Sequence, residues 1–543
     1  MNEPANIERS ARSGLLLKDG LIVDGTGQPA YRGDLLIQDD RIEEVSSVPI
    51  DFEGEIIECT GKVIAPGFID MHSHMDWILP ARDRPDLTAP FTAQGITTVV
   101  TGNCGFGMAG FRRNSKYRDL LEARFRDLYS ITWETMEEFL GKMREIGITH
   151  NMATLAGVGA SRASICGYEP GPLAQEQLDE LVGLIKDATD QGAHGVSLGL
   201  GYEPDIFATQ EELKAVARAV REKDKILTVH MRAYSALSGT YPLKLFGTPH
   251  NLKAIEDMLN LARETGVRLQ LSHLIFVGSR TWKTFDKALA MIDDARAEGL
   301  DVMFDTYAHN AGNSIVNVFM PAWFLAKGSQ AFEEKSALTR LRLEIFLMEK
   351  LLGFGYKNIQ LTNGLVEALH QYNGLFMTEI AEKRGMSNFK NIVDIARQTK
   401  GEALVLNHRY STPKQVKLMM QHPACLFQTD TVVDQGGIGS PCGYGTYPRF
   451  LQYARDDNLM PLEEVVHKMT GAAADRFRLA DRGRLKKGLA ADITVFDWQT
   501  VRDNTTTDNP SAAPTGIEYV IINGRIACAK GRVDSSLLPG QVL

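Results

Sequence analysis

Short apolar runs alternate with amphipathic stretches through the middle of the chain. The runs predict buried strands of a parallel sheet, and the stretches with apolar positions three or four residues apart predict helices between them, such as 173–190 and 209–223. We find eight candidate strands, which begin near Val63, Ile96, Asn151, Gly195, Ile226, Arg268, Asp301 and Cys425. Eight strands joined by helical crossovers are typical of an α/β fold closed into a (β/α)8, TIM-like barrel.

The two ends of the chain have a different pattern. Apolar runs separated by turn residues such as Asp19-Gly20 predict strands near the N-terminus, and a hairpin-type turn at Asn523-Gly524 follows two predicted strands near the C-terminus. We therefore expect a small β-sandwich domain assembled from both termini. Its first part is predicted at residues 1–64 and its second at 476–543, on either side of a barrel at 65–475.

One connection within the predicted barrel is unusually long. Residues 310–424 separate the seventh and eighth strands, far more than an ordinary crossover needs. We expect extra helices in this insertion, which could serve as a lid or as an oligomer contact.

Composition and charge narrow the class of protein. The chain has 543 residues, of which 44% are hydrophobic and 23% charged, as in ordinary globular enzymes. Its net charge of −9 argues against nucleic acid or an anionic membrane as a partner, and no apolar run is long enough to cross a bilayer. A small-molecule substrate is expected, and assembly into a homo-oligomer is possible.

Features of the termini and cysteines bear on the compartment. The stretch Met1 to Ser13 is polar and unlike a signal peptide, and it is compatible with a disordered leader. Six scattered cysteines argue against a disulfide scaffold. We therefore expect a reducing, cytoplasmic location.

Six side chains with metal-binding chemistry follow the predicted strands, and barrel enzymes carry their chemistry at the carboxyl ends of the strands. His72 and His74 are two residues apart after the first strand, so both can reach one ion. The second, fifth, sixth and eighth strands are followed by Cys104, His230, His273 and Asp430 respectively.

This donor set indicates a transition metal. Imidazole, thiolate and carboxylate groups suit Zn²⁺, with Mn²⁺ or another divalent transition metal as alternatives, whereas calcium and magnesium prefer oxygen ligands. Six ligands exceed one tetrahedral shell, so either two ions share a ligand or a second site is weak. Taken alone, a histidine at a strand end is usually a hydrogen-bonded core residue. Cys104 alone would be interpreted as an inert buried thiol, and Asp430 alone as a helix N-cap. Only the combination favours a metal site.

In this order the residues resemble the amidohydrolase superfamily, and within it the branch of the D-aminoacylases, or N-acyl-D-amino-acid deacylases. The resemblance covers nearly the whole chain, and the run from Ala65 to His74 is its most specific part. Gly95 to Val100 and Gly102 to Gly105 are similar to the D-aminoacylase branch in particular. Other matching runs are Asp24 to Gly27, Met469 to Gly471, Arg482 to Leu485 and Ala490 to Asp497.

The resemblance implies a role for each ligand. Cys104, His230 and His273 would hold the tight metal, and His72, His74 and Asp430 the weaker one. Many superfamily members bridge their metals with a carboxylated lysine after strand four, but Gly195 to Tyr202 contains no lysine. Cys104 would bridge instead, as in the D-aminoacylases. Asp430 would take a proton from the attacking water and pass it to the leaving group.

The expected substrate pocket departs from the D-aminoacylase branch. Ile275 stands where that branch has a lysine in a Ser-His-His-Lys run, and Cys442 where it has an arginine. Tyr202 and Tyr307 remain as candidate substrate contacts. His309 replaces a tyrosine and is either a second catalytic proton donor or a substitution that merely repacks.

These departures predict hydrolysis of a substrate without a free carboxylate. The leading class is a neutral amide, cyclic amide or imide, cut at a C–N bond. The alternative is a cyclohydrolase that opens a cyclic ketone or diketone at a C–C bond. A scaffold that has lost catalysis is the third, less favoured hypothesis.

Overall fold

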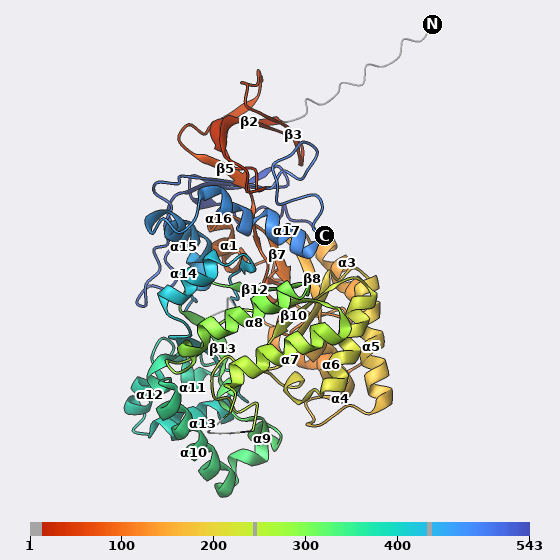
Figure 1. Ribbon diagram of the computed structural model, residues 1–543, viewed down its shortest axis with the longest axis vertical. Helices are drawn as coiled ribbons and strands as arrows, with labels where there is room; N and C mark the ends of the chain where they lie inside the picture. The colour runs from red at the N-terminus through yellow and green to blue at the C-terminus, as the bar shows by residue number, and fades with distance from the viewer. Residues whose placement is uncertain (1–13, 243–246, 432–436) are drawn as a thin grey trace.

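Eight parallel strands form a nearly closed barrel in the middle of the molecule (Figure 1), which confirms the predicted TIM-like fold. The structure is a computed structural model that describes residues 14–242, 247–431 and 437–543, so the predicted leader Met1 to Ser13 lies outside the described residues. Neighbours in the barrel are neighbours in the sequence. The strands are β6 (Phe68–Asp70), β7 (Ile96–Thr101), β8 (Asn151–Gly157), β9 (Gly195–Gly199), β10 (Ile226–His230), β11 (Arg268–Leu271), β12 (Val302–Thr306) and β16 (Cys425–Phe427).

Helices cover the outer surface of the barrel. The predicted helices at 173–190 and 209–223 correspond to α5 and α6, and a capping box at Thr209 fixes the start of α6. The helices outside the insertion are α1 (Ala89–Ala93), α2 (Lys116–Phe125), α3 (Met136–Ile146), α4 (Val158–Cys166), α5 (Gln175–Asp190), α6 (Gln210–Glu222), α7 (His250–Thr265), α8 (Phe285–Ala297), α15 (Cys442–Asp456), α16 (Leu462–Met469) and α17 (Gly471–Phe477).

Side chains close the barrel between its first and last strands. The Asp70 carboxylate, at the end of β6, accepts hydrogen bonds from the backbone N–H and the hydroxyl of Thr429 at 2.9 and 2.6 Å. The Tyr447 hydroxyl lies 2.6 Å from the carbonyl oxygen of Ile69 and 3.1 Å from that of Phe427. This seam fixes the two chain segments that carry three of the six potential ligands.

Both termini contribute to one nine-stranded sheet above the barrel (Figure 1). In this sheet β5 is parallel to β1 and antiparallel to β17, so the N-terminal and C-terminal strands are directly paired. The domain boundaries at 64/65 and 475/476 stay a prediction. The strands are β1 (Gly14–Ile22), β2 (Tyr31–Gln38), β3 (Arg41–Ser46), β4 (Glu55–Glu58), β5 (Val63–Pro66), β17 (Ile493–Phe496), β18 (Ile517–Ile522), β19 (Arg525–Ala529) and β20 (Arg532–Val533).

Two details of the predicted strands are wrong. The run that begins at Val63 forms β5 of the terminal sheet, and the first barrel strand starts only at Phe68. Gly67 permits the change of sheet, because a Cβ there would lie 2.2 Å from the Thr97 side chain. Asp19-Gly20 is an irregularity inside β1, which continues to Ile22 as one strand.

The long insertion contains the expected helices, together with a three-stranded antiparallel sheet that the sequence pattern did not predict. The sheet consists of β13 (Ala311–Ile315), β15 (Leu404–His408) and β14 (Ile359–Asn363) in that order. The helices are α9 (Ala322–Leu325), α10 (Lys335–Leu352), α11 (Glu367–His370), α12 (Met377–Lys383), α13 (Asn388–Gln398) and α14 (Pro413–Gln421). Within the described ranges, no helix has the length and apolar character that a membrane span requires.

A buried ion pair joins the terminal sheet to the barrel and provides a test of this arrangement. Arg482 donates to Asp492 at 2.5 Å, and the same carboxylate accepts hydrogen bonds from Asn151 of β8 and from the backbone of Asn523. We expect Arg482→Met to lower the free energy of unfolding by about 3–5 kcal/mol, because it leaves a buried carboxylate without its cation. Urea titration followed by fluorescence measures this loss.

Arg484→Met is the matched control, since Arg484 pairs with the exposed carboxylate of Asp475 at the surface. Exposed pairs contribute about 0–1 kcal/mol. Equal effects of the two substitutions would contradict the structural role of the buried pair.

Candidate metal centre

Two of the potential ligands, His230 and His273, lie close to the sulfur of a third, Cys104, which follows β7. The Cys104 Sγ lies 3.7 Å from Nδ1 of His230 and 3.5 Å from Nε2 of His273. The two imidazole nitrogens are 2.9 Å apart. The ends of strands β7, β10 and β11 therefore present one compact group of two nitrogens and a sulfur.

A second group lies on the other side of the same sulfur. Nε2 of His72 is 3.3 Å from Cys104 Sγ and 3.3 Å from Oδ1 of Asp430. Nε2 of His74 is 3.5 Å from the same Asp430 oxygen. Ligand atoms of His72, Cys104, His273 and Asp430 all lie within 4.8 Å of one another. The six residues thus form two triads that meet at Cys104.

The donor atoms fit a divalent transition metal. Tetrahedral zinc with ordinary bond lengths separates its nitrogen and sulfur ligands by roughly 3.3–3.6 Å, close to most distances found here. Burial lowers the pKa of His273 to about 4, so its imidazole is neutral, the form that binds metals. Burial also raises the pKa of the Cys104 thiol to about 11, so a thiolate at this position requires a nearby cation.

The carboxylate of Asp430 carries negative charge into this buried group. Burial opposes its ionisation, but the nearby imidazoles of His273 and His72 hold the pKa of the Asp430 carboxyl well below its ordinary value. Asp430 also lines the cavity beside the centre. Its ionised carboxylate therefore faces that cavity.

Three of the ligand residues adopt left-handed backbone conformations. The φ angles are 55° at Cys104, 33° at His273 and 46° at Asp430, and none of these residues is a glycine. Such conformations cost about 1–3 kcal/mol each and persist only where the surroundings enforce them. Here the backbone N–H of His273 donates to Asp305 and that of Asp430 donates to the carbonyl of His72.

Sequence analysis missed Asp305, a buried carboxylate at the end of β12. Its Oδ1 accepts the His273 backbone N–H and lies 3.7 Å from Nδ1 of His72, while Gln270 donates to its other oxygen at 2.8 Å. Asp305 therefore holds the backbone of one ligand and faces the ring of another. The available signal was a single acidic residue within the apolar run of a predicted strand.

Two cavities open on either side of the six residues. The larger, of about 180 Å³, is lined by Tyr202, Ile275 and Tyr307 on the barrel side and by residues of the insertion on the other. The smaller is lined by His74, Cys104 and Asp430 together with residues such as Arg124 and Glu402. Three of the four predicted substrate-binding residues therefore line the space beside the ligands.

The fourth predicted contact, Cys442, lies elsewhere, as does His309. Cys442 is buried at the start of α15, where its thiol donates to the carbonyl of Ala311 at 3.4 Å. His309 is buried with its Nε2 3.8 Å from Asp503. Neither residue is among the described residues that line the two cavities.

The arginines that line the cavities already have partners. Arg232, which sequence analysis did not single out, donates to the backbone carbonyl oxygens of Ile206 and Ala208 in the larger cavity. Arg124 donates to Glu402 at 3.0 Å in the smaller one, with its guanidinium 4.6 Å from the Trp77 ring centroid. Both guanidinium groups are therefore engaged within the protein.

Comparison with known proteins yields a consistent set of relatives. The model of the amidohydrolase family matches residues 55–330 and 351–528. A D-aminoacylase from Alcaligenes xylosoxydans xylosoxydans is 29% identical over 517 residues, which cover 94% of this chain and 93% of that protein.

Solved structures agree with this similarity. A structure of a D-aminoacylase with a binuclear metal centre matches with a TM-score of 0.79 and 27% identity. The match covers 97% of this chain and 99% of that one. An N-acyl-D-glutamate deacylase from Bordetella bronchiseptica, complexed with zinc and a phosphonate inhibitor, has a TM-score of 0.78 and 27% identity, with 98% and 100% coverage.

The position of Asp305 leads to a test of the centre that does not depend on a substrate. We expect Asp305→Asn to weaken zinc binding about 10–100-fold, because it alters the contacts that orient His273 and His72. Titration of metal-depleted protein with Zn²⁺ against a chromogenic chelator measures the affinity. Asp286→Asn, at an exposed position of α8, is the control. Unchanged zinc affinity in Asp305→Asn would contradict this role.

Proposed function

Because this chain belongs to the amidohydrolase family and is a metal-dependent hydrolase, we propose that it hydrolyses a C–N bond of a neutral amide or cyclic amide. The observation that carries the proposal is the convergence of ligand atoms from His72, Cys104, His273 and Asp430 within 4.8 Å. His273 and Asp430 of this group line a cavity with a largely apolar insertion wall, in which a substrate has access to Asp430.

In this proposal Cys104, His230 and His273 hold the tightly bound ion, and His72, His74 and Asp430 hold a second, weaker one. Cys104 lies between the two triads and serves both. Zn²⁺ fits the donor set best, with Mn²⁺ or another divalent transition metal as alternatives. When bound, such an ion lowers the pKa of water to about 7 and polarises a substrate carbonyl.

Asp430 is the proposed proton carrier. Its carboxylate is ionised, lines the cavity and lies beside His72 and His74, so it can accept a proton from the attacking water at Oδ1 or Oδ2. The same carboxyl then gives the proton to the leaving nitrogen. His309 has no part in the proposal, because its Nε2 lies beside Asp503 and it does not border the described cavities.

The larger cavity favours a substrate without a free carboxylate. Holding a carboxylate in a partly dry site requires a cation or several donors. Ile275 instead places an apolar side chain in the wall, while Tyr202 and Tyr307 supply the aromatic surface. The Tyr307 hydroxyl has no hydrogen-bond partner among the described residues and is free to contact a substrate.

The first functional prediction concerns Asp430→Asn, which keeps the shape of the side chain and removes the base. We expect kcat to fall about 10²–10⁴-fold, the usual contribution of a positioned acid or base. Steady-state kinetics together with elemental analysis of each preparation separates loss of the base from loss of metal. A fully metal-loaded variant with near-normal turnover would refute the assignment.

The second functional prediction concerns substrate class. We expect the enzyme to turn over cyclic amides, imides or neutral amides. For N-acetyl-D-Met and N-acetyl-D-Glu we expect kcat/KM to be lower by about two to four decades. The reason is that Ile275 and Cys442 stand where the D-aminoacylase branch has a lysine and an arginine, and each charge-assisted contact from such a cation to the substrate carboxylate is worth about 1.5–3 kcal/mol. The L-forms are the stereochemical control, and cyclic diketones test C–C bond cleavage. Values of about 10⁴ M⁻¹s⁻¹ or above for an N-acetyl-D-amino acid would restore a deacylase assignment.

A further inference from the structure

One helix of the insertion forms part of the active-site wall. Helix α10 contributes Ile345, Met348 and Leu352 to the larger cavity. These residues are three, four and seven positions apart and so occupy one face of the helix. Leu343 and Phe346 belong to the opposite side and are 58% and 52% exposed. The helix thus presents a distinct apolar face to the substrate space.

From this arrangement we propose that α10 and its neighbours bind an extended, uncharged apolar arm of the substrate, an alkyl or aryl chain. The proposal rests on the proposed function, since it extends the same site beyond the scissile bond. We call this space the α10 chamber and define it by Ile345, Met348, Leu352, Phe319, Met320 and Ile275, all of which line the cavity that also reaches His230, His273 and Asp430.

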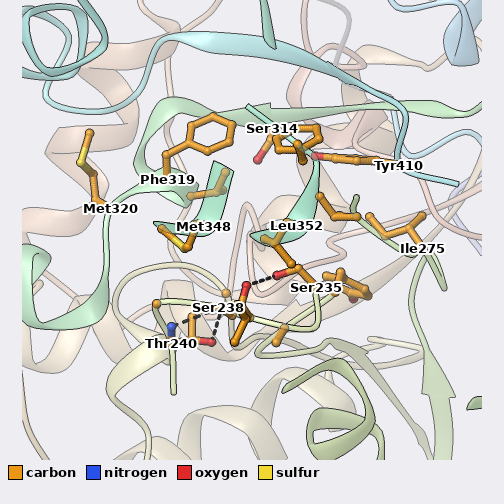
Figure 2. Close-up of a pocket in the computed structure, with 18 of the residues that line it drawn as sticks. Ser235, Ser238, Thr240, Ile275, Ser314, Phe319, Met320, Met348, Leu352 and Tyr410 are labelled. Atoms are coloured by element: carbon orange, nitrogen blue, oxygen red, sulfur yellow. Dashed lines mark hydrogen bonds between the residues drawn. The ribbon is translucent and has the colours of Figure 1, made fainter. Parts of the chain in front are cut away.

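Three hydroxyl groups along one side of the chamber are hydrogen-bonded within the protein. Figure 2 shows Ser235, Ser238 and Thr240 together on one side, with Phe319, Met348 and Leu352 on the other. The Ser235 hydroxyl donates to the carbonyl of Leu237 at 2.5 Å, and the Ser238 and Thr240 hydroxyls are 2.8 Å apart. Thr240 also donates to the carbonyl of Arg232 at 2.7 Å. On this side of the chamber a polar arm would therefore compete with hydrogen bonds that the protein already makes.

Charge excludes an anionic arm. The chamber end of the cavity is lined by Glu349, one residue after Met348, and the metal end by Asp430. The cationic Arg232 donates to two backbone carbonyl groups. A carboxylate at the far end of the arm would face Glu349 and lose its hydration, and no described residue that lines the cavity offers it an unengaged Lys or Arg side chain. A neutral hydrocarbon arm meets neither cost.

Part of the chamber wall lies outside the ranges that the family model matches. The amidohydrolase family model leaves residues 331–350 unmatched, and these residues include most of α10. The metal ligands lie within the matched ranges, whereas Ile345, Met348 and Glu349 do not. The candidate metal ligands therefore all lie within the matched ranges, whereas part of the chamber wall does not.

The test uses the metal-loaded protein and a series of primary amides, namely acetamide, butanamide, hexanamide and octanamide. Calorimetric titration gives Kd, and a coupled assay for ammonia measures hydrolysis separately. Each methylene that leaves water for the chamber should lower Kd about fourfold. Octanamide should therefore bind roughly 4 × 10³-fold more tightly than acetamide if all of its added methylenes are buried, and several hundredfold more tightly if most of them are.

A substitution that fills the chamber isolates its contribution. Met348→Trp should weaken octanamide binding about tenfold or more, because the larger side chain occupies the space of the arm, and should leave acetamide binding nearly unchanged. Leu343→Trp, on the exposed face of the same helix, should change neither. Leu352→Ala is a second variant that should also reduce the gain per methylene, and it serves if Met348→Trp does not fold.

The outcomes separate this inference from the proposed function. A Kd that does not depend on chain length, or a gain that persists in folded Met348→Trp, overturns the chamber. A chain-length dependence that Met348→Trp removes supports it whether or not ammonia is released. Absence of ammonia from all four amides would instead count against hydrolysis of simple neutral amides.

Discussion

The cost of holding six polar side chains together in a buried space is the constraint on which the rest of the structure depends. His72, Cys104 and His273 are almost completely buried, and their donor atoms lie within 4.8 Å of one another. Buried polar groups without partners are unfavourable by a few kcal/mol each, so the convergence is stable only on a rigid framework or around a bound cation. The barrel supplies that framework by bringing the carboxyl ends of its strands to one place.

Much of the surrounding architecture serves this convergence. The seam between β6 and β16 is made by Asp70, Thr429 and Tyr447, and it brings the His72–His74 segment next to Asp430. Three ligands then leave their strands through left-handed backbone conformations. These backbone conformations lower the local stability of the centre, and the hydrogen bonds that His273 and Asp430 donate to Asp305 and to the His72 carbonyl limit the cost.

The barrel, and the place of the six candidate ligands after its strands, could be predicted from the sequence because both depend on short-range pattern. His72 and His74 stand out by a spacing of two at a strand end, and the other ligands follow apolar runs that become strands. Asp305 was missed because a single acidic residue within such a run has no periodic signature. The positions of His309 and Cys442 depend on how the chain turns after a strand, which nearby residues do not determine.

The insertion shows the same limit on a larger scale. Its length predicted additional helices, but the return of α10 to the cavity depends on packing between residues far apart in the sequence. The small sheet β13–β15–β14 arises in the same way, from pairing of segments separated by up to about 90 residues. Local patterns of hydrophobicity do not determine which distant segments pair, so neither this sheet nor the placement of α10 could be predicted from them.

The terminal sheet has a consequence for how the protein is made. Strand β5 pairs with β17, about 430 residues later in the chain, and this pairing cannot form until nearly all of the protein has left the ribosome. At about 5–20 residues per second, the N-terminal strands wait about 20–90 s for their partners. During that interval the edge of β5 that later pairs with β17 is uncovered. An apolar strand with an unpaired edge can associate with other chains. Chaperone demand during synthesis is therefore built into the topology, independently of the stability of the finished enzyme.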